Sequence, residues 1–457
     1  MYQEFFDQLR KIFKPYNDLP NFNVLPKEGI DKQEIIQLLK KMLDKENEKW
    51  EKGFVSGAVY HGAKEHIQFL NEIYAISSQV NPLHPDIWPS VLKIEREIVE
   101  MTSKFLHGNE EVCGSVTSGG TESILLAMKA YRDFAKKKKG INEPEIILPS
   151  SAHAAFDKAA NYFNIKLRYV NLNENFEANV EEIKEAINEN TIAIVASAPC
   201  FPFGTIDPIE EISEIALDKN IPFHVDACLG GFILPWARKL GYEIKKFDFE
   251  LEAVTSISVD LHKYGYSPKG CSLILYKNSE FWKYQFYINT KWSGGIYFST
   301  TLAGSRAGAL IIAAWATLLY LGESGYLKHT KQILEVADYI KSELKKIQDL
   351  KILGNPLWII AITSEKFDIY EIIENMNNLG WNVNVLMNPA AFHIAITLRH
   401  DFAVAKKFIE DLKSAISRAK ETKREGLAPI YGMMATLPKE ESNEIISYLI
   451  QWLYKDP

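Results

Sequence analysis

The chain has 457 residues, of which 47% are hydrophobic and 24% charged, a balance typical of a globular protein rather than of a disordered or fibrous one. Its 59 acidic residues outnumber its 52 basic residues, so the net charge of −7 does not favour nucleic acid as a partner. The cysteines lie far apart, without a CxxC pair or zinc-like spacing, which predicts a reduced cytoplasmic protein without a metal site. They are Cys113, Cys200, Cys228 and Cys271.

Neither a signal peptide nor a transmembrane segment is expected. Residues 1–16 mix acidic, basic and aromatic side chains without an apolar stretch. The longest apolar run, at 307–321, is shorter than the roughly 20 residues that span a bilayer. We therefore expect a soluble protein in which this run forms a buried helix.

An N-terminal arm at 1–57, with a helix at 32–50, precedes the first alternating elements. A helix is then expected between residues 85 and 111, before a short strand at 112–116. The segments that follow are helix 122–138, strand 145–149, helix 154–163, strand 167–170, helix 180–187, strand 192–197, helix 209–219 and strands 223–226 and 256–260. This alternation predicts an α/β domain at 58–325, with a mostly parallel sheet that binds ligands at the carboxyl ends of its strands.

The pattern changes after Gly325. A long amphipathic helix at 327–347 is followed by two strands, near 357–363 and 392–398, and a helix at 402–420. These elements predict a small α+β C-terminal domain at 326–457.

The strongest local pattern is SVDLHKYG at 258–265, where His262 and Lys263 follow an apolar strand in a turn. A lysine at a strand end can attack an aldehyde carbon, and we expect burial to lower its pKa so that the neutral amine is available. Most turn lysines are simply exposed, so the interpretation depends on the residues upstream.

Three further groups follow earlier strands. Asp226 can pair with a protonated pyridine nitrogen, although a single aspartate there is more often a strand-end cap. Gly120 and Thr121 open a helix whose N-terminus can hold a phosphate, although such turns are also common without a ligand. His153 can stack on an aromatic ring. Since all four groups are expected at one sheet edge, they predict that pyridoxal 5′-phosphate binds there, with Lys263 as its Schiff-base lysine.

Several stretches resemble the group II pyridoxal-phosphate decarboxylase family, in the fold-type I (aspartate aminotransferase-like) class. The resemblance covers roughly residues 50–325, with a weaker match at 429–433. The stretches are SGAVYHG (56–62), NPLHPD (81–86), TSGGTES (117–123), SSAHAAFDKA (150–159), HVDACLGGF (224–232), DLHKYGYSPKG (260–270) and GGIYFSTTLAGSR (294–306).

The resemblance implies the same roles for Lys263, Asp226 and His153, and it adds His262 beside the cofactor phosphate held by Gly120 and Thr121. The family includes lyases that act on phosphorylated long-chain bases. Their substrate-phosphate residues fall on Tyr60, Asn81, His84 and Lys269, with Tyr297 and Tyr431 as second-tier contacts. The expected catalytic residues are Lys263, Lys269 and Tyr60.

Two activities are consistent with this resemblance. The first is retro-aldol cleavage of a phosphorylated long-chain base to a fatty aldehyde and phosphoethanolamine. The alternative is decarboxylation of tyrosine, glutamate or aspartate. The phosphate-binding set favours the lyase, and it leaves the β-hydroxyl base open between Lys269, a tyrosine and the cofactor phosphate. A scaffold without activity is disfavoured because all four cofactor groups are present.

Two further expectations come from the resemblance. Phe203 stands where the family commonly has histidine, which leaves the fit of the substrate open. A homodimer with shared active sites is implied, in which residues 297–301 reach the neighbour's cofactor.

Overall fold

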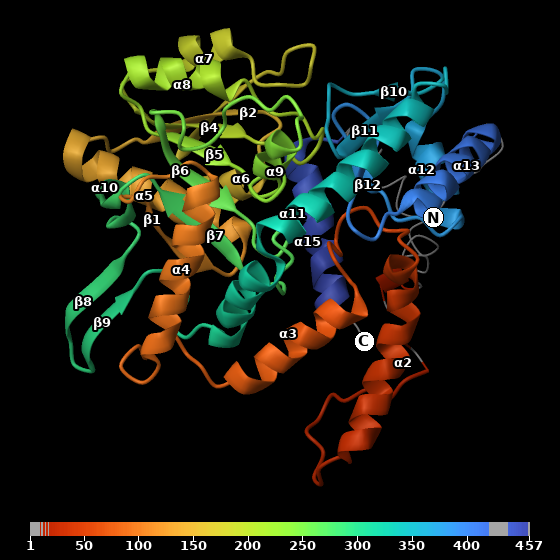
Figure 1. The fold of residues 1–457 in the computed structure, drawn as a ribbon, viewed down its shortest axis with the longest axis horizontal. Coiled ribbons are helices and arrows are strands. Elements are labelled where there is room, and N and C mark those ends of the chain that lie inside the picture. Colours follow the sequence, from red (N-terminus) through yellow and green to blue (C-terminus); the bar gives the residue numbers. More distant parts are fainter. Residues whose placement is uncertain (1–9, 11, 14, 17, 420–436, 456–457) are drawn as a thin grey trace.

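The computed structural model describes residues 10–455 except 11, 14, 17 and 420–436, and a seven-stranded sheet forms its centre (Figure 1). The strand order is β1-β7-β6-β5-β4-β2-β3. The strands are β1 (Cys113–Thr117), β2 (Glu145–Pro149), β3 (Lys166–Val170), β4 (Thr191–Ser197), β5 (Phe223–Asp226), β6 (Val254–Val259) and β7 (Ser272–Tyr276). Strands β2 to β6 pair in parallel, whereas β7 is antiparallel to both β1 and β6. The expected mainly parallel α/β sheet is confirmed.

Strand β2 shows why these segments form a central sheet. Its Ile147 belongs to one apolar core, whereas Ile146 and Leu148 belong to another. Successive side chains of a strand point to opposite faces, so both faces of the sheet are covered. The helices of this part are α4 (Pro89–Phe105), α5 (Gly120–Lys139), α6 (Ala155–Phe163), α7 (Val180–Ala186), α8 (Ile209–Asp218), α9 (Leu234–Lys239) and α10 (Ser279–Trp282).

One long helix, α11 (Gly308–Leu344), joins the two helices expected at 307–321 and 327–347, with a break in helical geometry at Gly322. It packs against α3 (Lys64–Ser77), α4, α9 and α13 (Phe402–Arg418). By length and composition alone α11 could cross a membrane, but core helices of soluble proteins pass the same test. The N-terminal arm contains α2 (Lys32–Glu51), whose N-terminus is capped by Asp31.

The C-terminal part has a second, antiparallel sheet of order β10-β11-β13-β12. Its elements are β10 (Lys351–Ile352), β11 (Ile359–Thr363), α12 (Ile369–Asn378), β12 (Asn384–Leu386), β13 (Ala391–Ala395), α13 and α15 (Lys439–Lys455). The divisions at 57/58 and 325/326 remain a proposal, and α11 runs through the second of them.

A two-stranded ribbon was not expected from the sequence. Strands β8 (Tyr287–Trp292) and β9 (Gly295–Ser299) extend away from the central sheet (Figure 1). Their exposed apolar side chains are Tyr287, Ile288, Trp292, Ile296 and Phe298. An apolar surface of this kind marks an interaction site more often than a solvated one.

Candidate active site

The carboxyl ends of five strands of the central sheet meet around one cavity of about 390 Å³. The segments that follow β1, β2, β4, β5 and β6 all contribute to its lining. All six residues expected to bind the cofactor line it: Gly120, Thr121, His153, Asp226, His262 and Lys263. The fold therefore brings these six residues together at the carboxyl edge of the sheet.

Asp260 is a neighbour of Lys263 that the sequence analysis did not include. Its Oδ2 lies 2.7 Å from Lys263 Nζ, and its carboxylate is buried. Burial lowers the pKa of Lys263, but the charge and hydrogen bond of Asp260, with smaller contributions from Cys228 and Tyr60, together raise it above its usual value. The expected lowered pKa of Lys263 is therefore wrong: burial acts in the expected direction, but a carboxylate three residues earlier lies beside the amine.

The turn that carries Lys263 is anchored at three places. Tyr264 Oη donates to the carbonyl of Ile396, beyond β13, at 2.9 Å. Tyr326 Oη, in α11, donates to the carbonyl of Gly265 at 2.9 Å. His66 Nε2, in α3, donates to the carbonyl of Tyr266 at 2.7 Å. Since each bond joins the turn to a different element, they fix its position at the end of β6.

The glycine turn before α5 has no space for a side chain. A Cβ atom on Gly120 would lie 2.8 Å from both Asp260 Oδ1 and Cys228 Sγ. Glu122 fixes the same turn, because its carboxylate accepts from the backbone N–H of Ser118 at 2.6 Å and from that of Leu302 at 2.8 Å. The turn thus holds the N-terminus of a 20-residue helix at the cavity, where its dipole favours an anion.

Asp226 and His153 line the cavity from β5 and from the turn after β2. Asp226 Oδ1 accepts from the backbone N–H of Cys228 at 3.0 Å and from Ser258 Oγ at 3.1 Å. His153 Nδ1 accepts from the backbone N–H of Ala155 at 3.1 Å, which fixes the orientation of the ring. A buried carboxylate, a ring, an amine and a helix N-terminus are the groups that pyridoxal phosphate requires, so the residues present fit this cofactor.

Tyr60 and Lys269 lie close to each other and to the lysine turn. Lys269 Nζ is 4.5 Å from the centre of the Tyr60 ring, and Tyr60 packs edge-on against Tyr264. Partial desolvation and the charge of Lys263 lower the pKa of Lys269 to about 8. Burial raises the pKa of the Tyr60 hydroxyl to about 12, although the charge of Lys263 opposes it.

None of the expected substrate-phosphate residues lines the cofactor cavity within the described part of the chain, Tyr60 and Lys269 included. Asn81 Nδ2 donates to Ser305 Oγ at 3.0 Å, and its Oδ1 accepts from the backbone of Arg306 at 3.3 Å. His84 is exposed in the same turn, and Tyr297 lies on β9. Tyr431 lies outside the described residues.

Phe203, the departure from the family pattern, does not line this cavity either. It is buried against Phe176, with ring centres 4.9 Å apart, and belongs to a small apolar cluster that includes Leu353 and Ala361. Phe201, two residues earlier, lines the cavity instead. The influence of Phe203 on substrate fit is therefore indirect, through the packing of β11 on the loop after β4.

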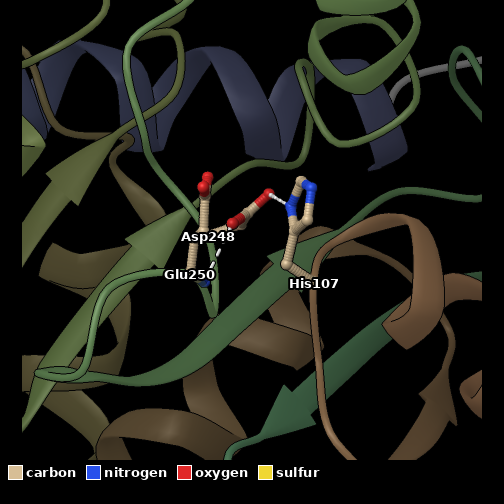
Figure 2. A group of neighbouring side chains, drawn as sticks. All are labelled: His107, Asp248 and Glu250. Atoms are coloured by element: carbon tan, nitrogen blue, oxygen red, sulfur yellow. Dashed lines mark hydrogen bonds and ion pairs between the residues drawn. The ribbon is translucent and has the colours of Figure 1, made fainter.

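One group of side chains in the described residues is close enough to hold a metal ion, and Figure 2 shows it: His107, Asp248 and Glu250. Asp248 Oδ2 accepts from His107 Nδ1 at 3.0 Å, and Arg238 Nη1 lies 2.9 Å from Glu250 Oε2. The carboxylates thus already have partners. Asp248 and Glu250 precede β6, so the group lies toward the opposite sheet edge from the cavity. We assign no metal to it.

Asp260, Cys228 and Glu122 are the site residues that the sequence analysis missed. Each one stands inside a stretch that carried the resemblance, within two residues of an assigned residue. The position of Asp260 three residues before Lys263 was the available sign, since a turn brings such residues together. The contacts of Glu122 with Leu302 span 180 residues, so no local pattern could have indicated them.

Residues 19–358 match the pyridoxal-dependent decarboxylase conserved domain. The chain is 47% identical to rat sphingosine-1-phosphate lyase 1 over 441 residues, which cover 95% of this chain and 77% of the relative. A solved sphingosine-1-phosphate lyase from Burkholderia pseudomallei is 38% identical with a TM-score of 0.91, covering 97% of this chain and all of that one. Lactobacillus brevis glutamate decarboxylase, with 21% identity and a TM-score of 0.77, covers 90% of this chain and 98% of its own, and shares the fold.

Proposed function

This chain belongs to the pyridoxal-dependent decarboxylase family and, within it, to the sphingosine-1-phosphate lyases. From this membership we propose a role for each residue of the site. The chain is a pyridoxal-phosphate-dependent lyase that cleaves a phosphorylated long-chain base to a fatty aldehyde and phosphoethanolamine. Amino-acid decarboxylation is disfavoured, because the decarboxylase with a similar structure is only 21% identical and shows the fold alone.

The cofactor would be held by four groups of the cavity. Lys263 would bind it covalently, Asp226 would face its ring nitrogen and His153 would cover its ring. Gly120, Thr121 and His262 would surround its phosphate at the N-terminus of α5. When bound, pyridoxal phosphate supplies an electron sink for the electron pair released by cleavage at the substrate α-carbon.

Asp260 would hold Lys263 in place. A lysine amine attacks a carbonyl carbon only in its neutral form, whereas the carboxylate at 2.7 Å stabilises the protonated form, so the amine must lose its proton before it reacts. Because Asp260 is buried beside a lysine and a histidine, it also keeps the amine pointing into the cavity. Its role is therefore that of a positioning residue.

Lys269 is the proposed base for the β-hydroxyl of the substrate. Its pKa of about 8 leaves a useful neutral fraction near neutral pH, whereas Tyr60, with a pKa of about 12, stays protonated. Tyr60 would then donate a hydrogen bond, and the protonated form of Lys269 would attract the substrate phosphate. The contact between Lys269 and Tyr60 beside Lys263 carries this assignment.

The active enzyme is proposed to be a cytoplasmic homodimer. Asn81, His84 and Tyr297 lie outside the cofactor cavity of their own chain, and Tyr297 is on the projecting ribbon β8–β9. These positions support a site whose substrate-phosphate end is completed by a second copy. The apolar side chains exposed on the ribbon would be covered in such a dimer.

Incubation of the purified chain and pyridoxal phosphate with sphingosine-1-phosphate tests the activity. A long-chain aldehyde and phosphoethanolamine should appear in equal amounts. Tyrosine, glutamate and aspartate serve as parallel substrates, with carbon dioxide as the readout. Carbon dioxide from any of them, without aldehyde from the phosphorylated base, would overturn the proposed function.

A further inference from the structure

A chain of buried polar side chains lies behind Asp226. Ser258 Oγ is 3.1 Å from Asp226 Oδ1 and 3.3 Å from His224 Nε2. His224 Nδ1 is 2.7 Å from Ser256 Oγ, which lies 2.5 Å from Tyr131 Oη. The parallel register of β5 and β6 pairs His224 with Ser256 and Asp226 with Ser258, so the two strands alone align most of this chain. All five residues are buried.

The direction of each hydrogen bond follows from counting hydrogens. Burial lowers the pKa of His224 to about 4, although the charge of Asp226 opposes it, so the ring is neutral and carries one N–H. Ser258 gives its only hydrogen to the Asp226 carboxylate. In the contact between Ser258 and His224, Nε2–H of the histidine must therefore donate to Ser258 Oγ. His224 Nδ1 must then accept from Ser256.

The hydrogen bonds from Ser256 through His224 and Ser258 therefore all point in one direction, toward Asp226. Ser256 has given its hydrogen to His224, and Tyr131 Oη has one hydrogen to share between Ser256 Oγ and Thr255 Oγ1, at 2.5 and 2.7 Å. A protonated Asp226 would donate to Ser258 instead and would reverse every bond behind it. The direction of the hydrogen bonds and the charge of Asp226 are thus coupled.

The two oxygens of Asp226 have different surroundings. Oδ1 accepts from Ser258 Oγ and from the backbone N–H of Cys228. Oδ2 accepts no hydrogen bond from the residues that the structure describes, and Asp226 lines the cavity. One oxygen is therefore fixed by the protein, and the other is available to a ligand. The nearby Cys228 is a thiol, because burial holds its pKa well above the usual value.

We propose that His224 is a positioning residue: its Nε2–H, acting through Ser258, holds the Asp226 carboxylate in place with Oδ2 free for the pyridine nitrogen of the cofactor. The proposal depends on the proposed function, since it requires pyridoxal phosphate in this cavity. Loss of the His224 donor weakens the interaction between Asp226 and the pyridine nitrogen of the cofactor. The pyridine ring is then less protonated. His224 touches neither substrate nor cofactor in this scheme.

Two substitutions separate hydrogen bonding from packing. In His224→Gln the side-chain amide lies near the position of Nε2 and can still donate to Ser258. In His224→Asn the amide reaches only the position of Nδ1, so Ser258 loses its donor. Both variants lose the imidazole ring and part of its volume, so each is a control for the packing of the other. Ser258→Ala removes the link with a smaller change to the core.

The readouts are the ¹⁵N chemical shift of the ring nitrogen of labelled pyridoxal phosphate and the dissociation constant of the cofactor. His224→Gln should resemble the unsubstituted chain. His224→Asn and Ser258→Ala should move the ¹⁵N signal toward that of the neutral ring and weaken cofactor binding about tenfold, as expected for one hydrogen bond to a charged group.

Three outcomes overturn the role of His224. These are an unchanged ¹⁵N signal in His224→Asn, an unchanged signal in Ser258→Ala, or equal losses in the asparagine and glutamine variants. Borohydride reduction of the unsubstituted chain, followed by peptide mapping, tests the proposed function separately. If no pyridoxyl group is found on Lys263, the proposed function fails. If it is found there and the ring signal does not respond, only the role of His224 fails.

Discussion

The two ends of the candidate site are built differently. The cofactor end lies at the carboxyl ends of parallel strands, where Asp226 and Lys263 are bonded to neighbours within the same chain. At the proposed substrate-phosphate end, Tyr297 lies on a projecting ribbon and His84 is exposed on a turn, which Asn81 joins to Ser305 and Arg306. Strand ends fix side chains through the sheet itself, whereas projecting segments depend on what covers them. One copy of the chain thus forms the cofactor end, whereas we propose that a second copy completes the other end.

The largest effect should come from Lys263→Ala at the cofactor end. Without an amine at the end of β6, turnover should fall below detection, and borohydride should trap no pyridoxyl group on the chain. Peptide mapping by mass spectrometry measures the trapped group. A variant that kept substantial lyase activity would contradict the assignment of this lysine.

Lys269→Arg should lower kcat by about a hundredfold, the contribution of a typical general base, and should leave the trapped pyridoxyl group on Lys263. Arginine keeps the positive charge for the substrate phosphate but does not lose its proton in proteins, so KM should change little. The kcat and KM values from initial rates provide the measurement.

The same assignment predicts a pH dependence. Lys269 accepts a proton only when neutral, and its pKa is about 8, so kcat/KM should rise as the pH increases through that value. The rising limb should be absent in Lys269→Arg. Persistence of the limb in this variant would assign it to another group.

Asp260→Asn should reduce turnover by roughly tenfold, because Lys263 loses the charged partner that positions its amine. Without the carboxylate charge, burial dominates, so the pKa of Lys263 should fall below its value in the unsubstituted chain. The pH dependence of the rate at which the chain condenses with pyridoxal phosphate measures this change. A midpoint moved to higher pH would contradict the effect of Asp260 on the lysine.

The smallest effect is expected at the ribbon. Trp292→Asp places a charge on an exposed apolar surface that the proposed dimer would bury, and it should weaken self-association about tenfold or more. Sedimentation velocity over a range of concentrations measures the association. Leu217→Asp, on exposed helix α8, is the matched control and should have no effect. If both chains sediment as the unsubstituted protein does, the ribbon does not form the interface.

The sequence predicted the parts of the fold that repeat one local pattern. Strands β2 and β5 have the expected limits, since continuous apolar runs between helices are typical of a buried parallel sheet. The ribbon β8–β9 was missed because its strands pack against no sheet face, and so they lack the expected pattern. The two helices expected at 307–321 and 327–347 are the two parts of α11, which meet at the non-helical Gly322.

The sequence predicted individual residues of the site but not the contacts between them. Asp226 and Lys263 each follow an apolar strand, which a sequence reveals. The wrong pKa direction for Lys263 came from an acceptor whose position depends on the turn. Likewise, Ser256 faces His224 only because of the register between β5 and β6. The register between two strands cannot be predicted from the sequence of either strand alone.

The three bonds that anchor the Lys263 turn have a consequence for distant substitutions. The carbonyl of Ile396, which follows β13 in the C-terminal sheet, accepts a hydrogen bond from Tyr264. A substitution that displaces β13 should therefore also displace Tyr264, which is next to Lys263. The absorbance of the bound cofactor would then report on the C-terminal sheet. Damage far from the cavity could be followed by eye, as a change of colour.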